Sequence, residues 1–295
     1  MVEGGLRNLA HDVSNWGRWG PDDDRGTLNL ITPAITRRAL ALVQDGDVFS
    51  LGKPLRVKDS KQNPPSALQF PLATAPADIS AQDALFLNPH GFEMTHLDAL
   101  GHSFFDGYAY NGRKVADILT ADGLGFSSIS SAASGIVTRG VLLDVAEAAG
   151  VPFLGRHAGI SPEDLENCEE FQRVRIGEGD AIFVRSGLDV RETVEGPSEE
   201  REGVLPEILR LLHERDVAIY SGDCIEKLPS GYADIPVPFH QIGMAMMGLW
   251  LLDNPDVERL AAACRARGRY EFTVVIAPLE QPGGTASAVN PLVLF

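Results

Sequence analysis

The chain has 295 residues, of which 44% are hydrophobic, so it is long enough to bury a substantial core in one large domain. Its formal net charge of −16 argues against nucleic acid or an anionic membrane as a partner. No stretch approaches the roughly 20 apolar residues of a membrane span, and the first residues lack the basic and apolar regions of a signal peptide, which predicts a cytoplasmic protein.

Residues 15–31 are dense in turn-forming residues, which argues against a regular element there. They carry Trp16 and Trp19, and two interpretations stay open: a lid whose indoles wall a hydrophobic substrate pocket, or a strap that packs them on the core. A helix is predicted next, with Thr32 as its N-terminal cap and Pro33 at its first position.

Gly46 follows the end of that helix, and the pattern becomes strand-like from residue 47. We therefore divide the chain into an N-terminal strap and helix, residues 1–45, and a main domain, residues 46–295. Residues 53–80 contain five prolines and are predicted to form an irregular surface excursion. That excursion either shapes the substrate entrance or is a tolerated insertion.

The stretch from Thr95 to His102 carries three side chains that can hold or serve a metal. On an extended strand, side chains two residues apart point the same way, so His96 and Asp98 share a face with backbones about 7 Å apart. An imidazole nitrogen and a carboxylate oxygen suit zinc or manganese. His102 follows Gly101, where the chain can turn, and is predicted to return over the metal as a proton carrier. The alternative is a buried, hydrogen-bonded His–Asp pair without a metal.

Residues 104–112 are aromatic and rich in turn formers, and Phe104 lies two residues after His102. An aromatic side chain there suits a flat substrate, or it packs in the core. Further on, strands alternate with capped helices, which indicates an α/β or mixed domain. Strands are predicted at 135–145, 217–220 and 272–277, and residues 179–187 are predicted to form a turn, a buried strand and a second turn. The predicted helices begin after Ser161 and span 205–215 and 256–267. Residues 282–291 are predicted to form a glycine-rich surface loop or subunit contact.

At Thr95, His96, Asp98 and His102 the sequence resembles the metal-dependent cyclase-like hydrolases, which include bacterial kynurenine formamidase and isatin hydrolase. These residues fall on the last four marked places of the family motif His-x-Gly-Thr-His-x-Asp-x-x-x-His. The resemblance implies the swivelling β/β/α fold of that family and a homo-oligomer.

The first two places of the motif do not match, because Phe92 and Met94 stand there. Phenylalanine cannot bind a metal, so Phe92 is expected to line the substrate pocket, together with Trp16, Trp19 and Phe104. His90 is the nearest imidazole, but on a straight strand it lies roughly 20 Å from His96. It can help only if the chain bends at Gly91.

The resemblance also implies that a histidine and an acidic residue join the metal site from further along the chain. His240 and Asp253 are the candidates, although the family has the longer glutamate. Asp253 is equally suited to cap the helix that begins near Pro255.

The expected function is hydrolysis of an amide or lactam in a small molecule. A Zn²⁺ or Mn²⁺ ion lowers the pKa of a bound water, the hydroxide attacks the carbonyl, and His102 carries the proton. Two alternatives remain: a lactone hydrolase of the dienelactone type, and a non-catalytic binding protein on the same fold.

Overall fold

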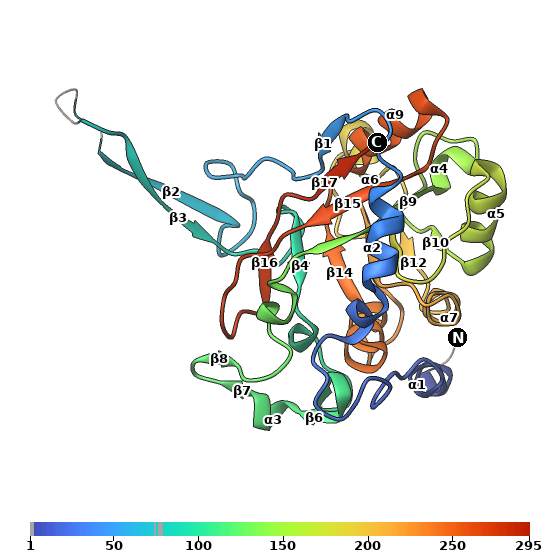
Figure 1. The fold of residues 1–295 in the computed structure, drawn as a ribbon, viewed down its shortest axis with the longest axis horizontal. Coiled ribbons are helices and arrows are strands. Elements are labelled where there is room, and N and C mark those ends of the chain that lie inside the picture. Colours follow the sequence, from blue (N-terminus) through green and yellow to red (C-terminus); the bar gives the residue numbers. More distant parts are fainter. Residues whose placement is uncertain (1–2, 74, 76–78) are drawn as a thin grey trace.

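The computed structural model of the chain describes residues 3–73, 75 and 79–295. Within this part, a nine-stranded sheet runs through the molecule in the order β1-β17-β15-β9-β11-β13-β14-β4-β16 (Figure 1). Strands β9, β11, β13 and β14 are parallel to one another, and the strands on either side of them pair antiparallel. Their bounds are β1 Val48–Ser50, β4 His96–Asp98, β9 Ile136–Asp144, β11 Ala181–Arg185, β13 Ile219–Gly222, β14 Trp250–Asp253, β15 Glu271–Ile276, β16 Ala286–Ala288 and β17 Leu292–Leu294.

Successive side chains of the central strands enter two different cores, one on each face of the sheet. In β9, Val141 and Leu143 pack into one core, whereas Leu142 packs into the other. β11 repeats this alternation, with Phe183 on the same side as Leu142. Because both faces are covered, these strands contain runs of consecutive apolar residues, such as 141–143 in β9 and 181–184 in β11.

Helices cover both faces of the sheet. Side chains of α1, α5, α7 and α8 belong to the first core, and side chains of α9 belong to the second. The helices are α1 Glu3–Asp12, α2 Pro33–Leu40, α3 Val115–Ile118, α4 Val145–Ala148, α5 Pro162–Gln172, α6 Leu188–Glu195, α7 Ile208–Glu214, α8 Pro238–Ile242 and α9 Val257–Arg267. Short 3-10 turns lie at Gly26–Leu30, Leu100–His102, Tyr110–Gly112 and Ile129–Ala132, and a π-helical turn at Gly243–Met247 follows α8. The expected α/β class is confirmed.

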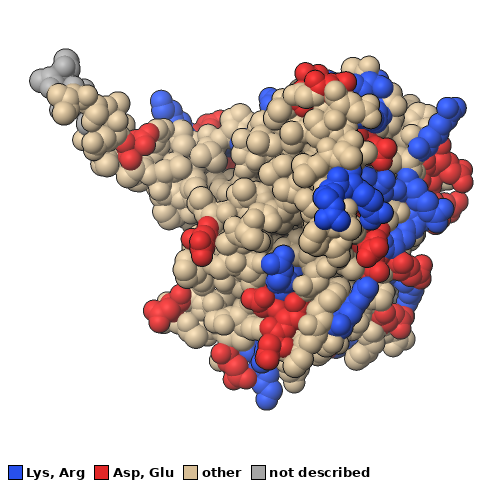
Figure 2. Space-filling model, viewed as in Figure 1, with Lys and Arg blue, Asp and Glu red and all other residues tan. Residues whose placement is uncertain are grey.

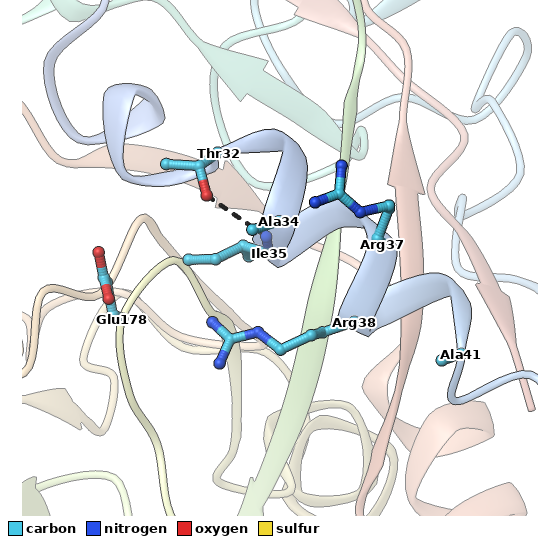
Figure 3. Close-up of a pocket in the computed structure, with 7 residues that line it drawn as sticks. All are labelled: Thr32, Ala34, Ile35, Arg37, Arg38, Ala41 and Glu178. Carbon is cyan, nitrogen blue, oxygen red and sulfur yellow. Dashed lines mark hydrogen bonds between the residues drawn. The ribbon is translucent and has the colours of Figure 1, made fainter.

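Local capping signals located the starts of two helices, and a third helix is capped by a residue other than the one predicted. The Thr32 hydroxyl oxygen accepts a hydrogen bond from the backbone N–H of Ile35, at 3.3 Å, at the start of α2 (Figure 3). Ser161 and Asp164 form a capping box at α5. Asp256, rather than Asp253, caps α9, so the carboxylate of Asp253 is available for another role.

Two predictions about irregular segments were wrong. Residues 53–80 are not wholly irregular, because β2 (Ala67–Ala73) pairs with β3 (Gln82–Leu87) in a projecting hairpin. Residues 282–291 are not only a loop, because β16 pairs with β4 and extends the main sheet. β2 and β16 were not predicted, because prolines or glycines lie in or beside these segments and argue against a strand. In the structure, pairing with neighbouring strands outweighed that local signal. The remaining short strand pairs are β5 Tyr108–Ala109 with β6 Arg113–Lys114, β7 Leu119–Thr120 with β8 Gly123–Leu124, and β10 Gly159–Ile160 with β12 Gly203–Val204.

The N-terminal segment packs along the body of the fold. Leu6 and Leu9 of α1 are fully buried in the first core. The hydroxyl of Thr27 donates to the backbone oxygens of Ala218 and Gly248. The sequence did not predict α1, and the division of the chain at residue 45 stays a prediction. In the described residues, no helix is long and apolar enough to cross a bilayer.

Candidate metal centre

The predicted ligands converge at the ends of two neighbouring strands. β4 pairs antiparallel with β14, and in this register Asp253 lies directly opposite His96. Asp98 ends β4, and its side chain, like that of His96, is almost completely buried. His240 comes from α8, which begins with Pro238 and lies in the chain just before β14. The sheet therefore brings together residues that are about 150 positions apart in sequence.

The distances between the side-chain atoms are those of a compact ligand cluster. The Nε2 atom of His96 lies 3.5 Å from Oδ1 of Asp98 and 3.9 Å from Oδ2 of Asp253. The Nε2 atom of His240 lies 3.8 Å from Oδ2 of Asp98 and 3.7 Å from Oδ2 of Asp253. Four ligand atoms around one ion at about 2.0–2.2 Å each are separated by comparable distances.

His90 also lies next to Asp98. Its Nδ1 atom lies 3.1 Å from Oδ1 of Asp98, and its Nε2 atom lies 2.9 Å from the hydroxyl of Thr285. The chain bends at Gly91, which has a φ of +106°, a conformation that glycine adopts readily. The straight-strand separation of His90 from His96 therefore does not apply, and the centroids of the two rings lie 5.7 Å apart.

His102 lies beside His90. Their rings are stacked with centroids 3.9 Å apart, and Nε2 of His102 is 4.0 Å from Oδ2 of Asp98. The side chains of this cluster form two groups whose members are close enough to share a metal ion. One group contains His90, Asp98 and His102, and the other contains His96, Asp98 and Asp253. Both contain Asp98, so its two oxygens can serve two ions or one. His102 is placed either to bind an ion or to move a proton next to it.

Hydrogen bonds orient the imidazole rings toward the centre. Nδ1 of His96 lies 2.9 Å from the backbone oxygen of Met94, to which it donates, so Nε2 is left with its lone pair facing the acids. Nδ1 of His240 lies 2.6 Å from Oε2 of Glu226, and the other oxygen of Glu226 accepts the backbone N–H of His240. Glu226 is buried and was not predicted from the sequence. It lies fourteen residues before His240 without a motif around it.

The charges of the cluster act on one another strongly. Burial by itself raises the pKa of Asp98, but the surrounding imidazoles of His96 and His90 outweigh burial and hold the pKa of Asp98 well below its usual value. Burial lowers the pKa of His102 to about 4, so this imidazole is neutral at pH 7. Burial also opposes the charged form of His240, yet Glu226 and Asp253 raise its pKa well above the usual value.

Three buried atoms in the centre make no hydrogen bond of good geometry within the described residues: Oδ1 of Asp253, and also Oδ1 of Asp98 and Nδ1 of His90, which face each other at 3.1 Å. Buried polar atoms in folded proteins are nearly always hydrogen-bonded or bound to an ion or water. All three atoms are of kinds that bind zinc or manganese. The donor set therefore fits a divalent metal.

Of the predicted substrate-binding aromatics, Phe92 shares a pocket with His240 and Asp253. Its ring is 58% exposed, and the guanidinium of Arg201 stacks on it at 4.0 Å from the ring centroid. Phe104 is half-buried, and its backbone oxygen accepts a hydrogen bond from the side chain of Gln241.

The two N-terminal tryptophans make different contacts. The indole N–H of Trp16 donates to the backbone oxygen of Ala245, and its ring lies 6.0 Å from that of Tyr108. The ring of Trp19 lies under the guanidinium of Arg18. The choice between lid and strap stays open, and a substrate role for either tryptophan remains a prediction.

A second hollow lies beside α2 and contains none of the predicted site residues (Figure 3). It offers two arginines and one acid but no histidine, so it lacks the ligands of a metal centre. Its lining residues are Thr32, Ala34, Ile35, Arg37, Arg38, Ala41 and Glu178.

Comparison with known proteins agrees with this architecture. The model of the family described as "Putative cyclase" matches residues 10–226. A solved structure described as a novel cyclase superposes with a TM-score of 0.86 at 26% identity, covering 96% of this chain and 100% of its own. No curated protein sequence matches the chain significantly.

Two more distant structures share the fold. Isatin hydrolase A from Labrenzia aggregata superposes with a TM-score of 0.61 at 17% identity, covering 88% of this chain and 96% of its own. A protein described as a potential metal-dependent hydrolase with cyclase activity superposes with a TM-score of 0.52 at 14% identity, covering 84% of this chain and 98% of its own. The expected swivelling β/β/α fold is thus confirmed.

Proposed function

Because the chain belongs to the cyclase family, we propose that it is a metal-dependent hydrolase that cleaves an amide, lactam or lactone bond of a small molecule. The observation that carries the proposal is the sharing of Asp98 by two groups of metal-ligand side chains, each containing a buried atom that makes no hydrogen bond of good geometry within the part of the chain that the structure describes. The printed descriptions of structural neighbours as isatin hydrolase and metal-dependent hydrolase support it further.

We assign the binding of the ion to His96, Asp98, His240 and Asp253, with His90 as an additional ligand. A Zn²⁺ or Mn²⁺ ion held by these residues would activate water and polarise the carbonyl group of the substrate. Glu226 holds the ring of His240 through the hydrogen bond at Nδ1, and the backbone of Met94 does the same for His96.

His102 is assigned the movement of the proton. It is neutral at pH 7 because burial lowers its pKa to about 4, so its free nitrogen can accept a proton from water. It then returns the proton to the leaving nitrogen or oxygen. Stacking against His90 keeps the ring in place during this transfer.

Arg201 and Phe92 support an anionic, flat substrate. The side chain of Arg201 is 18% exposed, and its one ion pair within the described residues, to Glu192, is long at 3.5 Å. The acids beside it have other partners, since Glu202 pairs with Arg191 and Glu226 pairs with His240. Arg201 therefore has donors left for a carboxylate on the substrate, and the exposed Phe92 ring offers an apolar contact.

The deciding experiment is elemental analysis of the purified protein, followed by assays on N-formyl aryl amides, isatins and unsaturated lactones. We expect about one or two equivalents of zinc or manganese in the parent and a loss in His96→Ala and His90→Ala. His157→Ala is the matched control, because this histidine is 74% exposed and pairs only weakly with Glu200. A parent that binds neither ion after incubation with both contradicts the proposal and favours a non-catalytic binding protein.

The His102→Ala variant separates the two roles open to that residue. If His102 carries the proton, we expect His102→Ala to keep its metal content while its turnover falls by about 10²–10⁴-fold. Loss of metal from this variant would instead make His102 a ligand.

A further inference from the structure

The bend that carries His90 lies at the base of the hairpin formed by β2 and β3. β3 ends at Leu87, and residues 91–94 belong to no helix or strand before β4 begins at His96. The hairpin projects from the molecule and, within the described residues, pairs with no strand of the main sheet (Figure 1). The space-filling view shows it joined to the body at one end only (Figure 2). Packing of the hairpin therefore does not fix the position of His90, and contacts at its base must do so.

Residues 60–66 form a loop against this bend and surround the side chain of Glu93. One carboxylate oxygen of Glu93 accepts the backbone N–H of Lys61 at 2.7 Å. The other oxygen accepts the hydroxyls of Ser60 and Ser66, at 2.5 and 3.0 Å. Ser66 is buried, and Glu93 is half-buried. Three donors from one loop thus hold a single side chain of the bend.

The loop requires a group that only accepts hydrogen bonds. Oγ of Ser60 already accepts two backbone N–H groups, from Gln62 at 3.3 Å and from Ser66 at 3.1 Å. Its own proton is therefore directed at Glu93. Burial raises the pKa of Glu93, but the hydrogen bonds from Ser60 and from the backbone of Lys61 outweigh burial and lower the pKa below its usual value. Glu93 is therefore a carboxylate at pH 7, and an amide in its place would put an N–H₂ group against donors.

Gln62, from the same loop, holds the backbone of the bend. Its Nε2 atom donates to the backbone oxygen of His90. A Cβ atom at Gly91 would lie 2.4 Å from Oε1 of Gln62, so the loop and the bend are in direct contact where the chain turns. Asn254 directly follows β14, and its Nδ2 atom donates to the backbone oxygens of Gly91 and Met94, at 2.8 and 3.1 Å. The backbone of the bend is therefore held by two separate parts of the chain.

We propose that Glu93 and residues 60–66, which we call the latch, position His90 at the metal centre. The bend places Nδ1 of His90 3.1 Å from Oδ1 of Asp98 and stacks its ring on that of His102, with centroids 3.9 Å apart. Both oxygens of Glu93 are occupied by the latch, so Glu93 acts through His90 as a positioning residue rather than as a ligand. Holding a ligand in place before the ion binds avoids the cost of ordering the bend at that moment. The inference rests on the proposed metal-dependent function.

The variant Glu93→Gln tests the latch, because it keeps the size of the side chain and removes its charge and one acceptor. We expect its affinity for Zn²⁺, measured by competition with a chromophoric chelator, to fall by about 10–100-fold, the usual effect of losing a group that orients a ligand. Glu195→Gln is the matched control, because Glu195 pairs with the partly exposed Arg156 and belongs to neither group of candidate ligands. It should bind Zn²⁺ as the parent does.

Proton NMR of the metal-free protein gives a readout that depends on no metal. The stacked rings of His90 and His102 are close enough for a nuclear Overhauser effect between them, which we expect in the parent and not in Glu93→Gln. The Nδ1–H signal of His240, which a separate hydrogen bond holds, should be unchanged. A general loosening of the site would change both signals.

If Glu93→Gln does not fold, Gln62→Ala decides, since it removes the donor to the backbone of His90 and leaves Glu93 in place. It should lose the same ring contact. The proposal is overturned if the folded variant keeps the ring contact or the Zn²⁺ affinity of the parent, or if the signal of His240 is lost as well. A parent that binds no ion contradicts the proposed function, and the ring contact in the metal-free protein still decides whether the latch positions His90.

Discussion

Arg191 and Glu202 form an ion pair from which solvent is excluded. Nε of Arg191 lies 2.9 and 3.1 Å from the two oxygens of Glu202, and neither side chain is exposed. A buried pair of this kind adds little net stability, but removal of one partner leaves a charge without compensation. Glu202 follows Arg201 in sequence and lines the same pocket as His240, so the pair holds one residue of that pocket in place.

We expect Arg191→Met to lower the free energy of unfolding by about 3–5 kcal/mol, because Glu202 would remain buried and unpaired. Arg156→Met is the control, since the pair of Arg156 with Glu195 is partly exposed and is expected to contribute less than about 1 kcal/mol. Urea unfolding of both variants measures the difference. Equal losses would contradict this account.

Arg201 yields a prediction about the substrate. If its guanidinium binds a carboxylate, Arg201→Gln raises KM for panel compounds that carry a carboxylate by about tenfold or more, and leaves uncharged analogues unchanged. Steady-state kinetics on paired compounds that differ only in the carboxylate make the comparison. An equal effect on both members of a pair would assign Arg201 a purely structural role.

At the scale of elements, the π-helical turn and β14 position Asp253. Gly248 ends that turn with a φ of +70°, and its backbone oxygen accepts hydrogen bonds from the N–H and the hydroxyl of Thr27. A Cβ atom at Gly248 would lie 2.5 Å from the ring of Tyr110 and 3.0 Å from Cα of Gly26. The turn therefore needs glycine both for its conformation and for close packing.

Gly248→Ala and Gly268→Ala form a matched pair, because both glycines end a helical segment with positive φ. A Cβ atom at Gly268 meets nothing within 4 Å. Gly268→Ala is therefore expected to lower the free energy of unfolding by only about 1 kcal/mol, the cost of placing alanine at a positive φ. Gly248→Ala is expected to cost about 1–3 kcal/mol more because of the clash with Tyr110. Thermal unfolding of both variants measures the two losses of stability. Losses of similar size would argue against tight packing at Gly248.

At the scale of the whole molecule, the metal centre connects segments that are distant in the chain. β4, α8 and β14 all contribute candidate ligands, so an ion bound there stabilises the native state and not the unfolded chain. Metal binding and folding are therefore expected to be linked.

Removal of the ion with a chelator should lower the melting temperature by several degrees. When the free ion concentration is about 100 times the dissociation constant, binding adds about 2.7 kcal/mol to the free energy of unfolding. Each kcal/mol changes the melting temperature by roughly 2–4 °C in a chain of this size. His96→Ala should melt at a temperature that the chelator does not change. A chelator effect of equal size in this variant would place the relevant ion elsewhere.

Much of the local structure was predictable because it depends on neighbours in sequence. Thr32 and Ser161 marked helix starts, since a cap and its helix lie within one turn. The spacing of His96 and Asp98 put both on one face of a strand, because the strand repeat is two residues. The cytoplasmic location and the division of the chain into two parts remain predictions.

The sequence by itself determined the α/β class, the His96–Asp98 pair and the resemblance to the cyclase family, because each follows from residues a few positions apart. Only the tertiary structure decided that the chain bends at Gly91 to bring His90 to Asp98, and that Glu226 holds His240. It also decided that Asp253 faces His96 across two strands rather than capping α9. These contacts join residues far apart in sequence, and their geometry depends on how strands pair and where the backbone turns, which short-range patterns do not specify.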